Sequence, residues 1–320
     1  MKVALAGEAL IDFTSVGDLR FQGYCGGSPL NAATAVARLG VPVGYVTQLS
    51  TDLFGLRLRR HLEANGVDTR FVLSADAPST LAFVERDGES NRYVFLANGT
   101  ADSRYAPDPL PSLPDETAFL HFGSVSLLVE PAATTFTRLV DAQRDRKIIV
   151  FDPNVRPTLI PDADSYRRRC QGWIAASHVL RLSDEDASYM AAGRGLEDAA
   201  AGWLASGPRV VIVTSGRDGA RVFRAGRPTV AVDAVPVEIA DTIGAGDTFT
   251  AAVTVALVDR GITTPDGLTN LPDDEWRGVL GFAATAAAIN CTRSGADPPS
   301  RDEVTAFLLE TASHPASDPG

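Results

Sequence analysis

Residues 241–249 read DTIGAGDTF, a stretch that joins a glycine-rich turn, a carboxylate and the start of an apolar run. Gly244 and Gly246 permit positive φ and a close approach of the backbone to a ligand. A helix beginning near Asp247 presents unpaired N–H groups that, with the helix dipole, attract anions. A carboxylate at this place would repel a bound phosphate, but it can take the proton of a hydroxyl that attacks a phosphoryl group. The stretch therefore indicates phosphoryl transfer, although a helix cap after a tight turn remains the plainer alternative.

The segments around this stretch alternate between short apolar runs and longer helix-like ones. The pattern predicts strands over 3–7, 43–49, 118–124, 147–152, 178–183 and 209–215, and helices over 28–40, 52–66, 131–146 and 162–176. In the first helix Ser28 is expected to be the cap and Pro29 to occupy the first helical position. Such alternation, with continuously apolar strands, predicts an α/β fold with a doubly wound, mainly parallel sheet covered on both faces.

Two segments depart from this pattern. Residues 80–98 contain two β-rich runs around a turn at 87–90, and residues 13–24 are turn-rich and β-like. They predict a small sheet inserted into the α/β body, which can be a surface ornament, a lid over a site or a dimerisation surface. Its apolar residues, Leu81, Phe83, Tyr93 and Phe95, lie in a segment too small to bury them, so we expect the outer face of this sheet to pair with the same sheet of a second subunit in a twofold homodimer. We predict one domain over 1–312 with this lid, and a disordered tail over 313–320.

Composition excludes several classes of protein. The chain has 320 residues, 45% hydrophobic and 22% charged, with a net charge of −11. This charge disfavours nucleic acid as a partner, and no apolar run reaches the ~18 residues of a membrane span. Three cysteines and four histidines, all widely spaced, indicate neither a disulfide framework nor a metal cluster. The P-loop motif, the protein-kinase motifs and a G-x-G-x-x-G after the first strand are all missing, which argues against those enzymes and against a dehydrogenase. We expect a cytoplasmic location.

Four motifs together resemble those of the ribokinase (pfkB) family of carbohydrate kinases: DTIGAGDTF, GGSPLNAA (26–33), DPNVRP (152–157) and VTSGRDG (213–219). The resemblance runs from residue 3 to about residue 310. It implies a ribokinase-like fold, a sugar hydroxyl as acceptor, and ATP and Mg²⁺ as cofactors, with a monovalent cation left open. Asp247 is then the catalytic base, and Gly244, Ala245 and Gly246 form the anion hole. A sugar or nucleotide sensor on the same fold is the alternative, and the retained aspartate with its glycine loop argues against it.

The resemblance also implies a sugar site, made of Asp12, Gly26, Gly27, Asn31, Phe95, Asn154 and Arg156. The two glycines allow the backbone to approach a ligand, and the Asn31 amide can bond two hydroxyls at once. A plain strand-to-helix turn is the alternative for the glycine pair and Asn31, and a solvated arginine in a loop is the alternative for Arg156.

For the nucleotide, the resemblance implies that Thr214, Gly216 and Gly219 lie against ATP and that TRSGA (292–296) lines the adenine pocket. Family members usually carry an Asn-x-x-Glu motif linked to magnesium and phosphate. This chain has Ser183 and Asp186 at those places, and the shorter Asp186 carboxylate can still contact a metal through water.

Within the family, HFGSVSLLVEP (121–131) and DPNVRP are most similar to fructokinases. A 2-keto-3-deoxygluconate kinase is the second candidate, and a ribokinase or nucleoside kinase the third. In the first two groups an arginine often follows the lid aromatic, where this chain has Ala97, so an anionic substrate would meet one cation fewer. We therefore predict a neutral ketohexose, fructose first, phosphorylated on a primary hydroxyl, although Arg156 would suit a carboxylate equally well.

Overall fold

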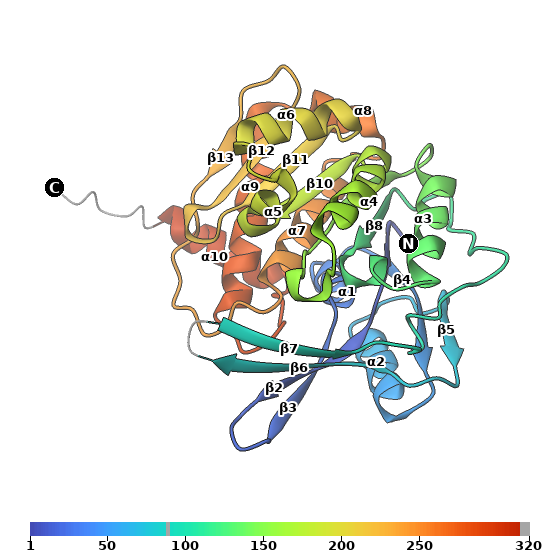
Figure 1. Ribbon diagram of the computed structural model, residues 1–320. Helices are drawn as coiled ribbons and strands as arrows, with labels where there is room; N and C mark the ends of the chain where they lie inside the picture. The colour runs from blue at the N-terminus through green and yellow to red at the C-terminus, as the bar shows by residue number, and fades with distance from the viewer. Residues whose placement is uncertain (88–89, 314–320) are drawn as a thin grey trace.

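The main body is built around one nine-stranded sheet (Figure 1). The computed structural model describes residues 1–87 and 90–313, so the predicted turn at 87–90 and the predicted tail lie largely outside the described residues. The strands, in their spatial order, are β13 (Val230–Val232), β12 (Ala220–Phe223), β11 (Val210–Thr214), β10 (Val179–Ser183), β9 (Ile148–Asp152), β8 (Phe119–Gly123), β1 (Val3–Ala6), β4 (Val43–Ser50) and β5 (Val72–Ala75). The strands from β11 to β5 pair in parallel, and β12 and β13 are antiparallel additions at one edge.

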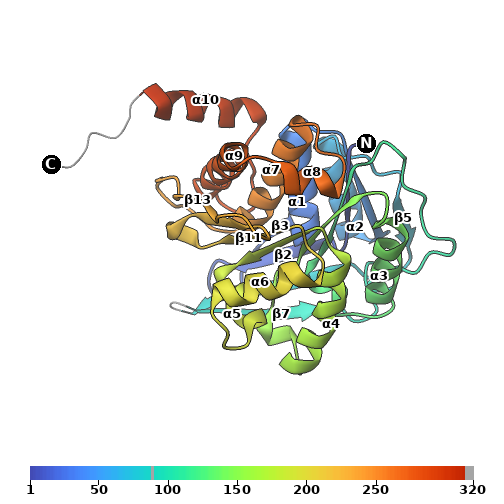
Figure 2. The same cartoon turned by 90° about the horizontal axis from the view of Figure 1, so that it is seen from above.

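Helices cover both faces of this sheet because alternate strand residues point to opposite sides (Figure 2). Leu5 and Tyr45 belong to the core that lies under one set of helices, whereas Ala6 and Phe122 belong to the core under the other. The first set is α1 (Ser28–Arg38), α2 (Leu53–Ala64), α7 (Ala245–Asp259), α8 (Pro265–Asn270), α9 (Asp273–Cys291) and α10 (Arg301–Ser313). The second set is α3 (Ala132–Gln143), α4 (Ala163–Ala176), α5 (Asp184–Ala191) and α6 (Leu196–Ser206). The predicted doubly wound α/β architecture is confirmed.

All six predicted strands and all four predicted helices are present, within a few residues of their expected ends. Asp52 caps α2 and Asp162 caps α4, each through its side chain. The cap predicted at Ser28 is wrong. The residue before α1 is Gly27, and Ser28 is the first helical residue, whose hydroxyl donates to Asp247 instead.

The predicted small sheet is present and has four strands in the order β3 (Phe21–Gly26), β2 (Leu10–Ser15), β6 (Thr80–Asp87) and β7 (Ser90–Leu96). Since only three residues separate the end of β1 from the start of β2, the main sheet itself carries this lid. Figure 1 shows the lid below the main body, on the side where the parallel strands end. The carboxyl ends of these strands are where α/β sheets bind ligands.

The two faces of the lid differ. In one row of paired residues, Asp12 lies opposite Ala82, which lies opposite Phe95. Phe13 lies in the next row, opposite Phe83, and the two rings stack with their centroids 5.0 Å apart. Alternate rows face opposite sides, so Phe83 and Phe95, both among the apolar residues that motivate the predicted dimer, lie on opposite faces of the lid. The side chain of Tyr93, a third member of that set, lies outside the described part.

No helix within the described residues is both long enough and apolar enough to cross a membrane.

Candidate active site

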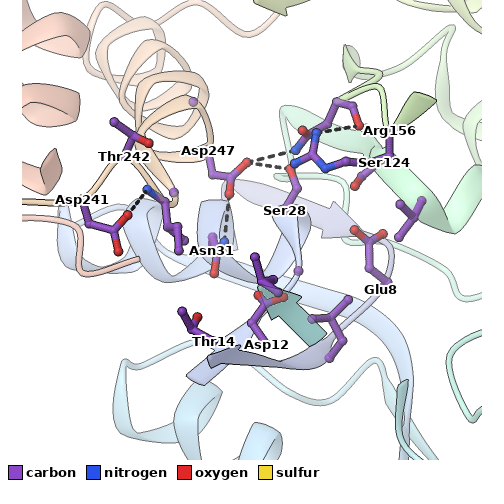
Figure 3. A pocket seen from close by; sticks show the side chains of 18 of the residues that line it. Glu8, Asp12, Thr14, Ser28, Asn31, Ser124, Arg156, Asp241, Thr242 and Asp247 are labelled. Carbon is purple, nitrogen blue, oxygen red and sulfur yellow. Dashed lines mark hydrogen bonds between the residues drawn. The ribbon is translucent and has the colours of Figure 1, made fainter. Parts of the chain in front are cut away.

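A cavity of about 580 Å³ lies between the lid and the carboxyl edge of the main sheet (Figure 3). Short polar segments that follow the strands supply its walls: Glu8 follows β1, Ser124 follows β8, and Asn154 and Arg156 follow β9. Its roof comes from the lid and its remaining wall from the start of α7. The cavity thus brings together segments that are distant in the sequence, as expected where parallel strands end together.

Asp247 lies at the centre of this cavity's polar contacts, on the first turn of α7. Its Oδ1 accepts a hydrogen bond from the Ser28 hydroxyl at 2.7 Å, and its Oδ2 accepts one from the Asn31 amide at 2.9 Å (Figure 3). The Asn154 amide is 3.4 Å from Oδ1. Burial raises the pKa of Asp247, and the hydrogen bonds from Ser28 and Asn31 oppose that rise. The result is an oriented carboxylate that holds a proton better than an exposed aspartate does, which suits a general base.

Glycine is favoured at positions 244 and 246, before Asp247, for two different structural reasons. Gly244 is the residue before α7 and has φ of 76°, in the left-handed region that favours glycine. A Cβ on Gly246 would lie 2.9 Å from Nη1 of Arg181, so any other residue at this position would require the guanidinium to move. The helix begins at Ala245, two residues earlier than expected, and the Ala245 N–H donates to the Thr242 carbonyl at 3.2 Å. The N–H groups of Gly246 and Asp247 follow in the same turn. In the first turn of a helix, backbone N–H groups have no carbonyl acceptor within the helix.

The other predicted glycine pair makes room for the lid aspartate. A Cβ on Gly26 would come within 2.0 Å of an Asp12 carboxylate oxygen, and one on Gly27 would lie 2.9 Å from the Glu8 carbonyl oxygen. Gly27 also has φ of 103°. Burial raises the pKa of Asp12 to about 7, and the nearby Arg156 guanidinium works against that rise.

The remaining predicted sugar-site residues also line this cavity. Phe95 reaches it from β7 of the lid, and Arg156 lies on its far wall. Asn154 has φ of 42°, a left-handed conformation that asparagine tolerates better than most residues. This backbone turn directs its amide toward Asp247. All the residues predicted for the sugar site are therefore brought together, Gly26 through its contact with Asp12.

A second cavity, of about 1070 Å³, lies on the other side of α7's first turn. The predicted nucleotide residues Thr214, Gly216 and Gly219 line it. Its apolar wall comes from α9, through Ala284, Ala287, Ala288 and Cys291, and from the segment 234–239. The prediction that 292–296 lines this cavity is wrong. Gly295 instead lies beside Tyr24 of the lid, and its N–H donates to Asp241 at 3.1 Å.

Asp186, predicted to contact a metal through water, has a structural role. Its Oδ1 accepts from the Val155 N–H at 2.8 Å and its Oδ2 from the Ser183 N–H at 3.2 Å. The Ser183 hydroxyl in turn accepts from the Asp186 N–H, which completes a capping box. Because both oxygens bond the backbone, Asp186 fixes the loop after β9 and is poorly placed for direct metal ligation. Asp186 and its neighbours Asp184 and Glu185 all line a third cavity, of about 420 Å³, beside the second, so a metal contact of Asp186 through water stays a prediction.

Arg181 is a site residue that the sequence did not reveal. It lies inside β10, its side chain is only 7% exposed, and it lines all three cavities. Nη1 donates to Asp152 Oδ2 at 3.1 Å and Nη2 to the Thr214 hydroxyl at 2.6 Å, whereas Nε has no hydrogen-bond partner within the described residues. A buried cation next to a helix N-terminus is an arrangement that favours an anion between them. A single arginine within an apolar strand carries no motif that could have identified it.

Comparison with known proteins agrees with this geometry. A family model described as pfkB family carbohydrate kinase matches residues 2–303. A fructokinase of Rhizobium leguminosarum bv. trifolii is 34% identical over 279 residues, covering 86% of this chain and 85% of the relative. A fructokinase of Klebsiella pneumoniae is 31% identical over 302 residues, covering 92% and 94%. Among solved structures, fructokinase from Xylella fastidiosa with bound ATP superposes with a TM-score of 0.89 at 25% identity, covering 97% of this chain and 99% of that one. The chain therefore belongs to the pfkB family of carbohydrate kinases.

Proposed function

We propose that this protein is an ATP-dependent fructokinase that phosphorylates the primary hydroxyl on C6 of fructose. The observation that carries the proposal is the place of Asp247: it lies at the N-terminus of α7, between a polar cavity and a larger, more apolar one. The first suits a sugar and the second an adenine nucleotide. Fructose has a second primary hydroxyl, on C1, but its neighbouring carbon is fully substituted, so the C6 hydroxyl is the less hindered nucleophile.

In this reaction the C6 hydroxyl lies against Asp247 and the γ-phosphoryl group lies over the first turn of α7. The sugar oxygen forms a bond to the γ-phosphorus while the bond from that phosphorus to the bridging oxygen breaks, and ADP leaves. The hydroxyl proton passes to Asp247. Ser28 and Asn31 orient the carboxylate, since each donates to one of its oxygens. Removal of the proton by a positioned base typically contributes ~10²–10⁴-fold to the rate.

The negative charge on the transferring phosphoryl group is stabilised by hydrogen-bond donors that the protein already holds in position. The N–H groups of Gly246 and Asp247 supply two, and we assign Arg181 as a third. Asp152 and Thr214 hold the two ends of its guanidinium. Arg156 lines the sugar cavity and the third cavity but not the nucleotide cavity, so it is better placed for the sugar or the attacked face of the phosphoryl group.

ATP fits the second cavity, whose small alanines leave room for a flat base and whose glycines allow the backbone to approach phosphates. Magnesium would neutralise charge on the phosphates. Within the described residues no cluster of three or more His, Cys, Asp or Glu side chains forms a metal site. We therefore propose that the phosphates and water hold most of the ion, with Asp184 and Glu185 as the protein carboxylates beside it. A monovalent cation remains to be tested by comparing activity in potassium and sodium salts.

Fructose is favoured as the substrate by the cavity and by the relatives. Both relatives cited above are named fructokinases and match most of this chain. Asp12 and Asn31 provide acceptors and a donor for neutral hydroxyls, and Ala97 supplies no charge for a sugar acid. The test is a panel of fructose, ribose, adenosine and 2-keto-3-deoxygluconate, measured by ADP release with the phosphorylated carbon identified by NMR. The highest kcat/KM is expected for fructose, and a higher value for any other member would refute the assignment.

We further propose that the enzyme is a homodimer formed through the outer faces of two lids. Val94 and Leu96 are 57% and 52% exposed on β7, and their positions place them on the face away from the sugar cavity. A twofold contact would cover them. Because the reaction uses ATP, we also propose the cytoplasm as its location.

A further inference from the structure

A side chamber of about 300 Å³ adjoins the sugar cavity. The two share Glu8, Phe95 and Val125 as lining residues, but Asp247 lines only the sugar cavity. Figure 3 places Glu8 on the opposite side of the sugar cavity from Asp241 and Thr242, which precede the catalytic turn. The side chamber therefore continues the sugar site away from the reacting hydroxyl.

The side chamber exists because small side chains line part of its wall. Ala97, directly after β7, and Ala132, at the start of α3, both line it. A long side chain at position 97 would occupy much of this volume. If fructose binds with its C6 hydroxyl on Asp247 and extends along the sugar cavity, its C1 end would point toward this space, and fructose itself has no group large enough to fill it.

The chemistry of the side chamber is acidic. Glu8 is 3% exposed and accepts from the Ser126 N–H at 3.1 Å, and Asp102 is 7% exposed and accepts from the Thr100 hydroxyl at 2.8 Å. Burial raises the pKa of both carboxyl groups. Among the described residues that line the side chamber, none is an arginine, lysine or histidine. Two buried carboxyl groups without a cationic partner there would gain one from a bound ammonium group.

We propose that the side chamber binds an amine-linked substituent on C1 of the sugar, so that the enzyme also phosphorylates 1-amino-1-deoxyfructose and its N-alkyl derivatives. This inference rests on the proposed function, since it assumes a ketohexose held by Asp12 and attacked at C6. The reaction is unchanged: the C6 oxygen takes the γ-phosphoryl group of ATP, its proton goes to Asp247 and ADP leaves. The secondary ammonium of the substituent lies beside Glu8, and its alkyl chain lies against Leu128 and Ala132.

The test compares three substrates: fructose, 1-deoxy-1-propylaminofructose and the neutral 1-O-propylfructose. We expect the amine to be used with a kcat/KM at least equal to that of fructose. The amine should exceed the ether by about 10-fold or more, as for a hydrogen bond to a charged group. Because Glu8 also lines the sugar cavity, Glu8→Gln is judged by the ratio of the two kcat/KM values within that variant, and this ratio of amine to ether should fall toward one.

Ala97→Phe, which fills the side chamber, should lower kcat/KM for both propyl compounds by at least about 10-fold, whereas fructose should change little. Ala106→Phe is the matched control, because Ala106 is exposed and lines none of the cavities described above. If the wild-type enzyme uses fructose but neither propyl compound, or if Ala97→Phe leaves their use intact, the inference is wrong and the proposed function stands. If fructose is not a substrate either, the proposed function fails with it.

Discussion

Asp12, which lines the proposed sugar site, is buried at a cost to the stability of the protein. Burial raises its pKa from an ordinary 3.8 to about 7 in the folded state. Each pH unit of such a difference corresponds to about 1.4 kcal/mol, so the ionised side chain should destabilise the fold by up to about 4 kcal/mol. Asp12 retains partial contact with water, which screens the effect, and we expect about 2–4 kcal/mol.

The upward shift of the Asp12 pKa determines in which direction the free energy of unfolding changes with pH. Well below pH 3.8 the carboxyl group is protonated in both the folded and unfolded states, and its burial then carries no cost from ionisation. Between pH 4 and 7 only the unfolded chain ionises, so the free energy of unfolding of the wild type should fall across this range and then level off. Asp12→Asn lacks the titration. The free energy of unfolding of Asp12→Asn should exceed that of the wild type by a small amount at pH 4 and by the full amount, about 2–4 kcal/mol, at pH 8.

Urea denaturation of both proteins at intervals from pH 4 to 8 measures this difference. Asp18→Asn is the matched control, because Asp18 is an exposed carboxylate in the turn between the lid strands β2 and β3, in a left-handed conformation that asparagine also tolerates. It should change stability little at any pH. A gap between Asp12→Asn and the wild type that does not vary with pH would refute the reasoning, because it would reflect packing and not ionisation.

Three further predictions concern the site and the assembly. Arg181→Met should lower kcat by about 10²–10³-fold with a smaller change in the KM for fructose, and Arg181→Lys should recover part of the lost kcat; an unchanged kcat in Arg181→Met would contradict the assigned role. Ser28→Ala removes a hydrogen bond that favours the charged form of Asp247, so the acid limb of the kcat/KM profile should move to higher pH; an unmoved limb would mean that Asp247 does not set it. Leu96→Glu should yield monomers in sedimentation at micromolar concentration, and a wild type that is already monomeric there would refute the proposed dimer.

Much of the fold was predictable because its signals are local. Strands such as β9 and β11 are continuously apolar, and caps such as Asp52 and Asp162 stand directly before their helices. The lid faces were harder to predict. Phe83 and Phe95 are both aromatic residues in β-rich runs, and only the register between β6 and β7, which pairs Phe95 with Ala82, shows that they point to opposite sides.

The candidate site was predictable where a motif marks it and not elsewhere. Asp247 lies in a glycine-rich signature, whereas Arg181 lies in an apolar strand and becomes a site residue only because β10 ends between three cavities. Ser28 has the appearance of a helix cap in the sequence, and its partner Asp247 is 219 residues away. Asp186 lies where a family motif suggested a metal contact through water, and its hydrogen bonds with Val155 and Ser183 show a structural role that the motif does not reveal. Such assignments depend on long-range contacts that spacing along the chain does not contain.

The central claim is that Asp247 removes the proton from the attacking hydroxyl. Asp247→Asn keeps the shape of the side chain and loses the basic oxygen, so sugar and ATP should still bind. Rapid mixing of the loaded variant with sampling of the phosphorylated sugar measures the chemical step alone. We predict a single-turnover rate lower by about 10²–10⁴-fold, with dissociation constants for fructose and ATP within a few-fold of the wild type. A rate within 10-fold of the wild type would contradict this account of the site.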